Sequence, residues 1–168
     1  MSKTISGVVV NADDFGYSDS VNRAITQCLK NNLISQTTVM VNMPGFAQAC
    51  QLSKEHGFEN QVGLHLNLSE GEPLTDRIKS LPMFCDNDGR FNGAFRRSRR
   101  FTFFMSSAEK KAVKEEVEAQ MKQYIGAGFM MMHMDSHHHT HTIPSILAVV
   151  IPLAKENGFR SMRISRNV

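Results

Sequence analysis

GVVVNADDFGYSDSVNRAITQCL, residues 7–29, decides the fold of this chain. Its opening GVVVNADD, residues 7–14, is a β-branched run that ends in polar residues and predicts a strand. The apolar positions of residues 21–29 follow a helical period, and Ser18 or Asp19 can cap that helix. The segment therefore predicts a strand that leads directly into a helix, the repeating unit of an α/β fold.

The same alternation continues along the chain. Further strands are predicted at TTVMVNMPG, QVGLHLNL, FMMMHMD and RSMRIS, which are residues 37–45, 61–68, 129–135 and 160–165. Further helices are predicted at residues 46–57, 106–125 and 144–158. The consecutive methionines indicate that their strand is buried on both faces. Strands and helices in alternation predict an α/β, (β/α) barrel-like fold with parallel strands inside and helices outside.

The composition is that of one globular domain. The chain has 168 residues, 41% of them hydrophobic, which predicts a single domain over residues 1–168. The net charge is +3, and much of the excess lies in RRSRR at residues 96–100, which we interpret as a solvated loop and not as a nucleic-acid surface. The cysteines are scattered and predict reduced thiols at Cys28, Cys50 and Cys85.

No targeting or membrane segment is predicted. The amino-terminal apolar run is too short for a signal peptide and meets carboxylates at once. No apolar stretch reaches the roughly 18 residues that suggest a membrane span. The sequence therefore predicts a soluble, cytoplasmic protein without a membrane partner.

Between residues 69 and 107 the periodicity fails. CDNDGRFNGAFRRSRRFTFF, residues 85–104, mixes turn residues with aromatic and arginine side chains. Such a segment is typical of a functional loop or lid, and its aromatic rings can stack on sugars. We expect it to select the substrate and not to form part of the core.

Three polar clusters follow predicted strands: NADD at residues 11–14, HLN at 65–67 and HMDSHHH at 133–139. In parallel α/β folds the carboxyl ends of the strands gather the working residues, so we expect these clusters to meet at one rim. Asp13 and Asp14 would face opposite ways in a regular strand. At the end of a strand the chain turns, and both carboxylates can then reach one site.

HMDSHHHTH, residues 133–141, concentrates its ionisable side chains at odd positions. In an extended segment, residues two apart point the same way. Five side chains are therefore expected to face one region: His133, Asp135, His137, His139 and His141. The run is interrupted by Thr140 and flanked by apolar segments, which argues against a purification tag or a solvated tract.

These residue types suit a catalytic metal site. One carboxylate and two imidazoles leave positions on a divalent ion for water and substrate, and a second aspartate is free to act as general base. This set suits hydrolysis of an amide or ester. The sequence contains no G-x-S-x-G, G-x-G-x-x-G or P-loop motif, which argues against a serine nucleophile and a nucleotide cofactor.

Four motifs are distributed along nearly the whole chain: VNADDFGYSDSVNRAI, TTVMVNMPGF, VGLHLNLSEGEPL and HMDSHHHTHTIP. Together and in this order they resemble the YdjC-like family of carbohydrate deacetylases, which includes the chitooligosaccharide deacetylases. The resemblance implies a (β/α) barrel-like fold, a small saccharide substrate and metal-dependent removal of acetyl groups from N-acetylated sugars. The implied cofactor is one divalent ion, Mg²⁺ or Zn²⁺.

The resemblance also implies roles for particular residues. The implied metal ligands are Asp14, His65 and His137, and the implied general base is Asp13. Four more residues are expected to bind the substrate or to support the ligands: Asn67, Asp135, His139 and His141. We interpret His133 and Asp135 as orienting the histidine-rich loop, and His138 as a structural hydrogen-bonding group.

Family members continue beyond the point where this chain stops. We therefore expect the chain to lack the family's C-terminal part, as a truncated product, a naturally shortened member or a protein that completes itself as a homodimer. Two alternatives to a deacetylase stay open. One is a non-catalytic metal- or sugar-binding homologue, and the other is a different metal-dependent hydrolase, for instance of phosphoesters.

Overall fold

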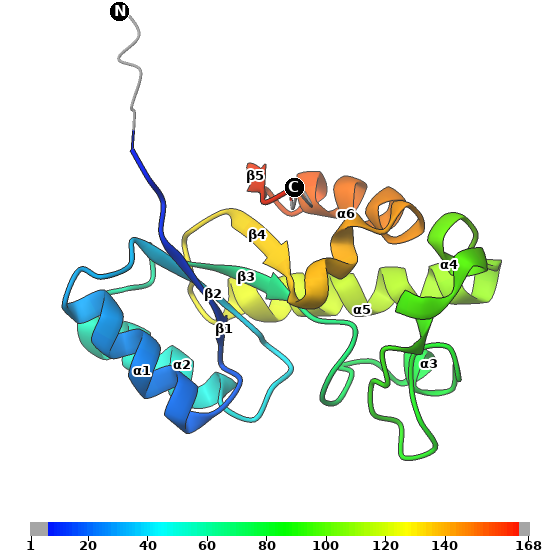
Figure 1. Ribbon diagram of the computed structural model, residues 1–168, viewed down its shortest axis with the longest axis horizontal. Coiled ribbons are helices and arrows are strands. Elements are labelled where there is room, and N and C mark those ends of the chain that lie inside the picture. The colour runs from blue at the N-terminus through cyan, green and yellow to red at the C-terminus, as the bar shows by residue number, and fades with distance from the viewer. Residues whose placement is uncertain (1–6, 165–168) are drawn as a thin grey trace, which may run out of the picture.

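The computed structural model describes residues 7–164, in which one sheet is surrounded by helices (Figure 1). The strands within this part of the chain are β1 (Asn11–Phe15), β2 (Gln36–Val39), β3 (Val62–Leu66), β4 (His133–Ser136) and β5 (Ser161–Met162). The α-helices are α1 (Asp19–Lys30), α2 (Phe46–His56), α3 (Asp76–Lys79), α4 (Arg99–Phe103), α5 (Ser107–Gly126) and α6 (Pro144–Glu156). Two 3₁₀ helices are η1 (Ala94–Arg97) and η2 (His137–Thr142). Residues 1–6 and 165–168, which include the end of the last predicted strand, lie outside the described residues.

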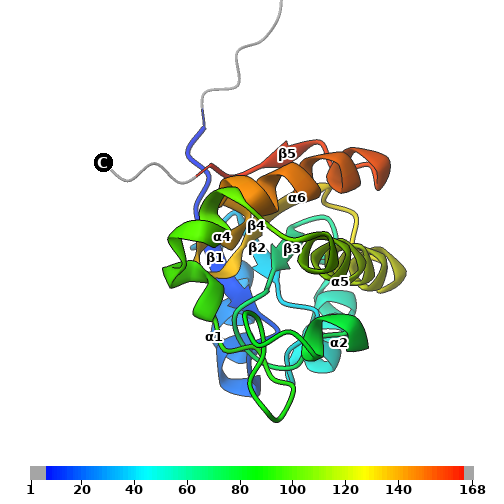
Figure 2. The ribbon, with the colours of Figure 1, turned by 90° about the vertical axis from the view of Figure 1, so that its right-hand side faces the viewer.

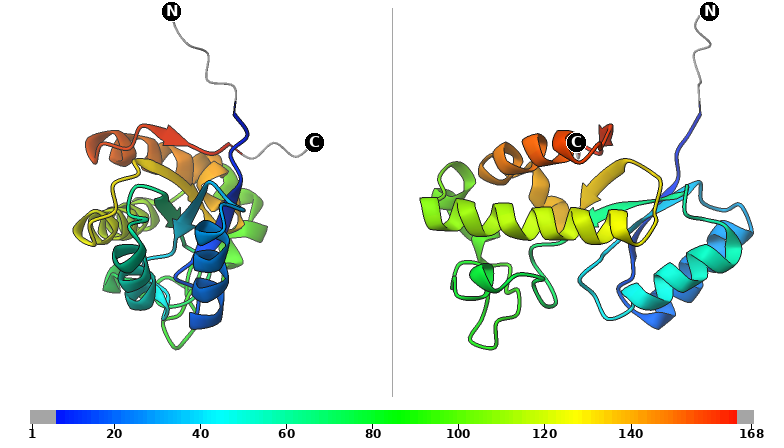
Figure 3. Two further views of the ribbon diagram at one scale, coloured as in Figure 1. Left: turned by 90° about the vertical axis from the view of Figure 1, so that its left-hand side faces the viewer. Right: turned by 180° about the vertical axis from the view of Figure 1, so that it is seen from behind.

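The strands are parallel, and their order in the sheet follows the chain, β1-β2-β3-β4-β5. Figure 3 shows α1, α2, α5 and α6 in an arc around this sheet. Parallel strands in chain order with helices outside are the arrangement of a (β/α) barrel, so the predicted α/β, barrel-like class is confirmed. Within residues 7–164, β1 pairs only with β2 and β5 only with β4, so the sheet is open at both edges.

The first strand begins later than its sequence predicts. It runs from Asn11 to Phe15, and the valines before it are exposed, by 87% at Val8 and 63% at Val9. The reason is the pairing register, because Asn11 lies opposite Gln36, where β2 begins. The two aspartates therefore lie inside the strand and not after its end.

Several helix ends follow their sequence signals. Ser18 caps α1 by accepting a hydrogen bond from the Val21 amide at 3.4 Å. Gly57 follows α2 in the left-handed conformation, with φ of 69°. Ser106 and Glu109 form the predicted capping box at the start of α5. None of the helices in the described residues is long and apolar enough to cross a membrane.

The methionine run is not a buried strand. β4 begins only at His133, and Met130 is 63% exposed. The inner face of β4 carries polar side chains, including buried Asp135, and only Met134 on its outer side belongs to the apolar core. The strand predicted over residues 129–135 is therefore confirmed only from His133 on, where Met134 and Asp135 are buried on opposite faces, and the methionines before it are not part of a strand.

The segment expected to act as a lid contributes side chains to the hydrophobic core. Its Phe95 and Phe101 are buried and pack with Phe84, which precedes the segment, with ring centroids between 5.1 and 5.3 Å apart. Phe103 and Phe104 are exposed. The expectation that this segment stays out of the core is wrong, because η1 and α4 are too short to show a helical period in sequence. In Figure 2, α4 and its loops lie on the side of the carboxyl ends of β3 and β4.

A buried carboxylate ties the loop after β3 to α5. Glu116 is fully buried and accepts hydrogen bonds from the Leu74 and Thr75 amides at 3.0 and 2.9 Å. It also accepts from the Thr75 hydroxyl at 2.7 Å and from Gln120 Nε2 at 2.8 Å. Hydrogen bonds to a carboxylate are stronger than those between neutral groups, so this contact fixes the path of the loop.

Glu116→Ala is expected to lower the free energy of unfolding by about 2–3 kcal/mol, because it leaves the part-buried amides of Leu74 and Thr75 and the buried Gln120 side chain without this acceptor. Urea unfolding measures the change. Glu118→Ala on the same helix is the control, since Glu118 only pairs with exposed Lys122 at 2.7 Å, and we expect a change below about 1 kcal/mol. Equal losses in the two variants would show that Glu116 does not anchor the loop.

Candidate metal centre

Polar side chains from several strands meet on the inner face of the sheet. Side chains alternate along β3 and β4, so His65 and Asp135 face inward while Leu64 and Met134 pack against the helices. His65 and Asp135 are also direct neighbours in the pairing of β3 with β4. The polar clusters that contain His65 and Asp135 are far apart in the sequence, but they are therefore adjacent in the fold.

Both aspartates of β1 reach this face because the strand is irregular. The register between β1 and β2 shifts between Ala12 and Phe15, and Asp14 has a φ of 67°. The left-handed conformation costs a non-glycine residue roughly 1–2 kcal/mol. It turns the Asp14 side chain to the same site as Asp13, where a regular strand would send the two to opposite faces.

Asp14, His65 and His137 converge at this point. Asp14 Oδ1 lies 3.1 Å from His65 Nε2 and 2.9 Å from His137 Nδ1. His137 makes a hydrogen bond there, whereas buried His65 Nε2 has no hydrogen-bond partner among the described residues. The structure thus brings together the three residues that the family resemblance implies as ligands.

The other ring nitrogen of His65 is held from behind. His65 Nδ1 lies 2.6 Å from Oδ1 of fully buried Asp135. Asp135 Oδ2 accepts a hydrogen bond from Thr38 Oγ1 at 3.3 Å. A carboxylate that accepts from Nδ1–H keeps the proton on that nitrogen, so Nε2 is the nitrogen that would bind a cation when its own proton is displaced. Asp135 therefore orients His65 toward Asp14.

Asp13 is held by a residue 150 positions further along the chain. Arg163 donates from Nη1 to Asp13 Oδ1 at 2.9 Å and from Nη2 to Oδ2 at 2.8 Å. Arg163 Nη2 also lies 3.0 Å from Asp135 Oδ2. Asn11 Nδ2 donates to Asp13 at 2.6 Å. A two-pronged guanidinium contact of this kind fixes the plane of the carboxylate.

Neighbouring charges shift the pKa values in this cluster. Burial raises the pKa of Asp13, but the guanidinium hydrogen bonds outweigh it and leave the pKa below its usual value. The hydrogen bond from His137 lowers the pKa of Asp14 far below its usual range. Burial lowers the pKa of His65, but the carboxylates of Asp135 and Asp14 outweigh it and raise the pKa to about 9. At neutral pH both aspartates of β1 are therefore anionic.

This donor set fits a divalent cation. Asp14, His65 and His137 each offer a ligand atom, and these atoms lie within 4.8 Å of one another. A buried nitrogen without a partner costs about 1–3 kcal/mol, and a cation would give His65 Nε2 that partner. One carboxylate with two imidazoles is a donor set found at catalytic metal sites.

The histidine-rich segment is extended only as far as Ser136. The chain then coils into η2, so the parity argument fails beyond His137. His141 is buried, with Nδ1 2.5 Å from Ser136 Oγ and Nε2 2.7 Å from the carbonyl oxygen of Arg163. His139 is exposed. The prediction that both histidines face the same region as His137 is therefore wrong.

The remaining histidines of the run also have definite places. His133, at the start of β4, lies 2.9 Å from Ser161 Oγ on β5. His138 lies nearer to the ligands than its even position predicts, with its ring centroid 4.0 Å from that of His137. His138 Nδ1 lies 3.1 Å from Ser69 Oγ, which agrees with the interpretation of His138 as a hydrogen-bonding group.

The loop after β3 brings a further carboxylate to the site. Asn67 organises this loop by donating from Nδ2 to Asn42 Oδ1 at 3.0 Å and to the Glu70 carbonyl at 2.7 Å. Glu70 Oε1 then lies 3.4 Å from His137 Nε2. Sequence reasoning singled out neither Glu70 nor Arg163. The sequence did place both residues where a site residue is expected, because Glu70 follows a predicted strand and Arg163 lies near the end of another.

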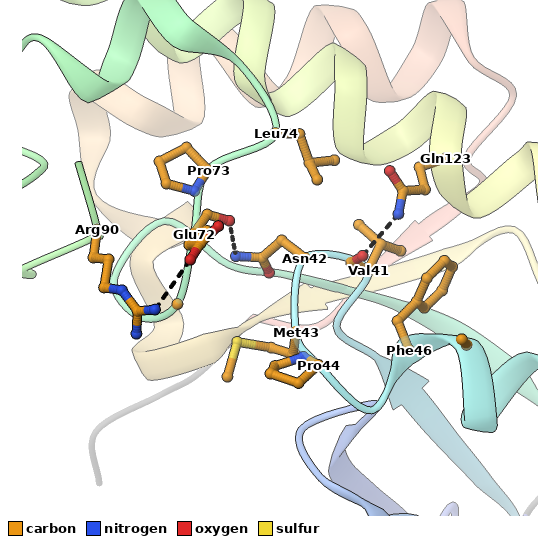
Figure 4. A pocket seen from close by; sticks show the side chains of 12 residues that line it. Val41, Asn42, Met43, Pro44, Phe46, Glu72, Pro73, Leu74, Arg90 and Gln123 are labelled. Carbon is orange, nitrogen blue, oxygen red and sulfur yellow. Dashed lines mark hydrogen bonds and ion pairs between the residues drawn. The ribbon is translucent and has the colours of Figure 1, made fainter. Parts of the chain in front are cut away.

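A cavity of about 500 Å³ lies beside this loop (Figure 4). Met43, Phe46 and Leu74 contribute to its apolar lining. An ion pair stands at one end, with Arg90 Nη2 3.1 Å from Glu72 Oε1. The lining contains no histidine and none of the residues of the metal cluster. The chemistry of the donor set, and not the size of this cavity, is therefore the basis for the candidate functional site.

A family model described as YdjC-like protein matches residues 7–168 of this chain. The chain belongs to the YdjC-like family. The match includes the strands and loops that carry Asp14, His65 and His137, so the converging residues lie within the YdjC-like region.

Two curated relatives of this YdjC-like chain are named carbohydrate deacetylase. The one from Brevibacillus brevis is 40% identical over 149 residues, and the one from Clostridium beijerinckii is 35% identical over 151 residues. The matches cover 89% and 90% of this chain but 56% and 57% of the relatives. The chain thus spans a little over half the length of these relatives.

A solved structure has the same fold. It is a crystal structure from Enterococcus faecalis V583 of a protein provisionally named a cellobiose-phosphate cleavage protein. The TM-score is 0.78 at 25% sequence identity, and the match covers 95% of this chain and 59% of the other. The likeness supports the barrel-like arrangement of this YdjC-like chain.

Proposed function

We propose that this chain carries the metal centre of a carbohydrate deacetylase that removes acetyl groups from N-acetylated sugars such as chitooligosaccharides. The observation that supports this most strongly is the convergence of Asp14, His65 and His137 beside an anionic Asp13. The names of the curated relatives point to the same activity. A single site then offers both a cation-binding set and a proton acceptor.

Asp14, His65 and His137 would hold one divalent ion, Mg²⁺ or Zn²⁺. Such an ion, when bound, polarises an amide carbonyl and lowers the pKa of water in its coordination sphere. Asp135 keeps His65 in the orientation and tautomer that suit a ligand. The left-handed conformation of Asp14 places its carboxylate between the two imidazoles.

Asp13 is the general base of this proposal. The Arg163 fork holds its carboxylate in one plane and keeps it ionised, while Oδ2, which among the described residues accepts only from Arg163, retains a second lone pair for a proton. Asp13 can then accept the proton of the water that attacks the acetyl carbonyl. The fixed geometry limits the motion that precedes proton transfer.

The other residues that the sequence singled out are proposed to support this centre. Asn67 shapes the loop that carries Glu70, and His141 joins the end of β4 to the backbone at Arg163. Exposed His139 is proposed to contact the saccharide.

A second candidate is cleavage of a phosphorylated disaccharide. The name of the Enterococcus faecalis structure favours it, and the same ligands would serve. The two reactions release different products, acetate from an acetamide and a monosaccharide from a glycosidic bond.

The test is acetate release from diacetylchitobiose. We expect acetate when Mg²⁺ or Zn²⁺ is present, loss of acetate after chelation, and recovery when the ion is restored. Phosphorylated cellobiose is assayed in parallel for sugar release. An ion-loaded chain that releases neither product would contradict both candidates and favour a non-catalytic metal- or sugar-binding protein.

A further inference from the structure

We propose that the mouth of the metal centre holds a second divalent-cation site, formed by Glu70, His137 and His138. Glu70 Oε1 lies 3.4 Å from His137 Nε2 and 3.8 Å from His138 Nε2. Two ligands on one tetrahedral zinc ion, each about 2.1 Å from the metal, are about 3.4 Å apart. The two distances to Glu70 Oε1 are thus close to the spacing that such an ion requires, and the three residues each offer a ligand atom within 4.8 Å of the others.

Each residue of this second site is held by its other polar atom. His138 Nδ1 lies 3.1 Å from Ser69 Oγ, and His137 Nδ1 makes its hydrogen bond with Asp14. Glu70 Oε2 accepts a hydrogen bond from the Tyr17 hydroxyl at 3.3 Å. These contacts leave two Nε2 atoms and Oε1 directed at one another. Partners of this kind orient the ligands of natural metal sites.

The backbone is strained where it presents His138. His138 and His139 have φ values of 54° and 53°, in the left-handed region that residues with a Cβ rarely adopt. Each such residue carries a free-energy cost, and here two of them follow in succession. The strain holds the His138 ring beside that of His137, and strain of this kind is concentrated at functional sites.

The ligand types select the class of ion. Two imidazoles and one carboxylate suit Zn²⁺, Co²⁺, Ni²⁺ or Cu²⁺, whereas Mg²⁺ prefers oxygen ligands. The side chains of Glu70 and His138 are 36% and 39% exposed, so an ion can reach them from solvent. The site therefore takes a transition-metal ion from solution.

The two sites share His137, and the inference rests on the proposed function through this residue alone. A neutral imidazole has one lone pair, because its other nitrogen carries the proton. With Nδ1–H bonded to Asp14, His137 offers Nε2 to the second site. An ion there therefore removes one ligand from the first site, and an excess of transition-metal ion competes with the first site for His137.

Cobalt binding tests the second site in a background that lacks the first. In the Asp14→Asn variant, titration with Co²⁺ followed by visible absorption should still show one bound ion per chain. Adding Glu70→Gln or His138→Gln should weaken Co²⁺ binding at least tenfold, within the 10–100-fold range that loss of a supporting group alone produces. Adding His139→Gln is the matched control and should change nothing, because exposed His139 is outside the cluster.

The outcomes separate this inference from the proposed function. If Asp14→Asn binds no Co²⁺, or if His139→Gln weakens binding as much as His138→Gln, the second site is refuted. Acetate release by the unaltered chain with Mg²⁺ is scored separately and tests only the proposed function. Circular dichroism melting curves identify any variant that has lost its fold, and Glu70→Gln then serves in place of His138→Gln.

Discussion

Replacing Asp14 by asparagine is expected to lower acetate release about 10³-fold, equal to about 4 kcal/mol of activation free energy. A neutral amide oxygen is a poorer ligand for a divalent cation than a carboxylate. The fold should survive, because asparagine tolerates the left-handed conformation found at this position better than most residues do. The effect therefore comes from charge and not from backbone strain.

Metal content is the second measurement on Asp14→Asn. It is made by elemental analysis in a His138→Gln background, so that only the site of Asp14, His65 and His137 contributes. We expect the tightly bound ion to be lost. Retention of the ion together with full activity would remove Asp14 from the ligand set.

Replacing Asp13 by asparagine is expected to lower acetate release about 10²–10⁴-fold while the ion stays bound, because the variant lacks the proton acceptor. The asparagine side chain retains one oxygen that can accept a hydrogen bond from Arg163. The position of residue 13 is therefore largely preserved. Rate and metal content must therefore respond differently in the two variants.

Asp19→Asn is the control for Asp13→Asn. Asp19 is an exposed acidic residue in the first turn of α1 and belongs to none of the candidate ligand groups, so we expect unchanged acetate release. If Asp13→Asn loses the ion as completely as Asp14→Asn, the division into ligand and base is wrong.

Local patterns predicted the fold class but not the ends of the strands. Alternating strands and helices, the Ser106–Glu109 capping box and Gly57 each depend on a few neighbouring residues, and each is confirmed. Strand ends depend on which partner is available. The β-branched run at residues 8–10 lies outside β1 because β2 starts only at Gln36, a fact of tertiary structure.

The grouping of the candidate ligands could be predicted from the parallel topology of the sheet, whereas the local conformation of the residues could not. Carboxyl ends of parallel strands gather polar residues, and this brought Asp14, His65 and His137 together. The positive φ of Asp14 has no signal in the sequence, since most aspartates in strands are regular. The coil that begins at His137 also overrides the period of two on which the parity argument depended.

Arg163 was missed because its importance depends on distance along the chain. Arg163 directly follows the short strand β5, where an arginine is ordinarily solvated, and although its position marks the end of a strand, local sequence gives no sign of a partner 150 positions earlier. Only the closeness of β1 to the end of β5 across the inner face makes the contact with Asp13.

The same long separation has a consequence for the order in which the protein folds. Contacts between neighbouring elements, such as the pairing of β1 with β2, close short loops and form at low entropic cost. The contact of Asp13 with Arg163 closes a loop of nearly the whole described chain. On the ribosome, a nascent chain that has already assembled β1 to β4 still has Asp13 without its guanidinium partner. The two-pronged contact that fixes the plane of the Asp13 carboxylate can therefore form only after Arg163 has been synthesised, which places it late in the folding of these residues.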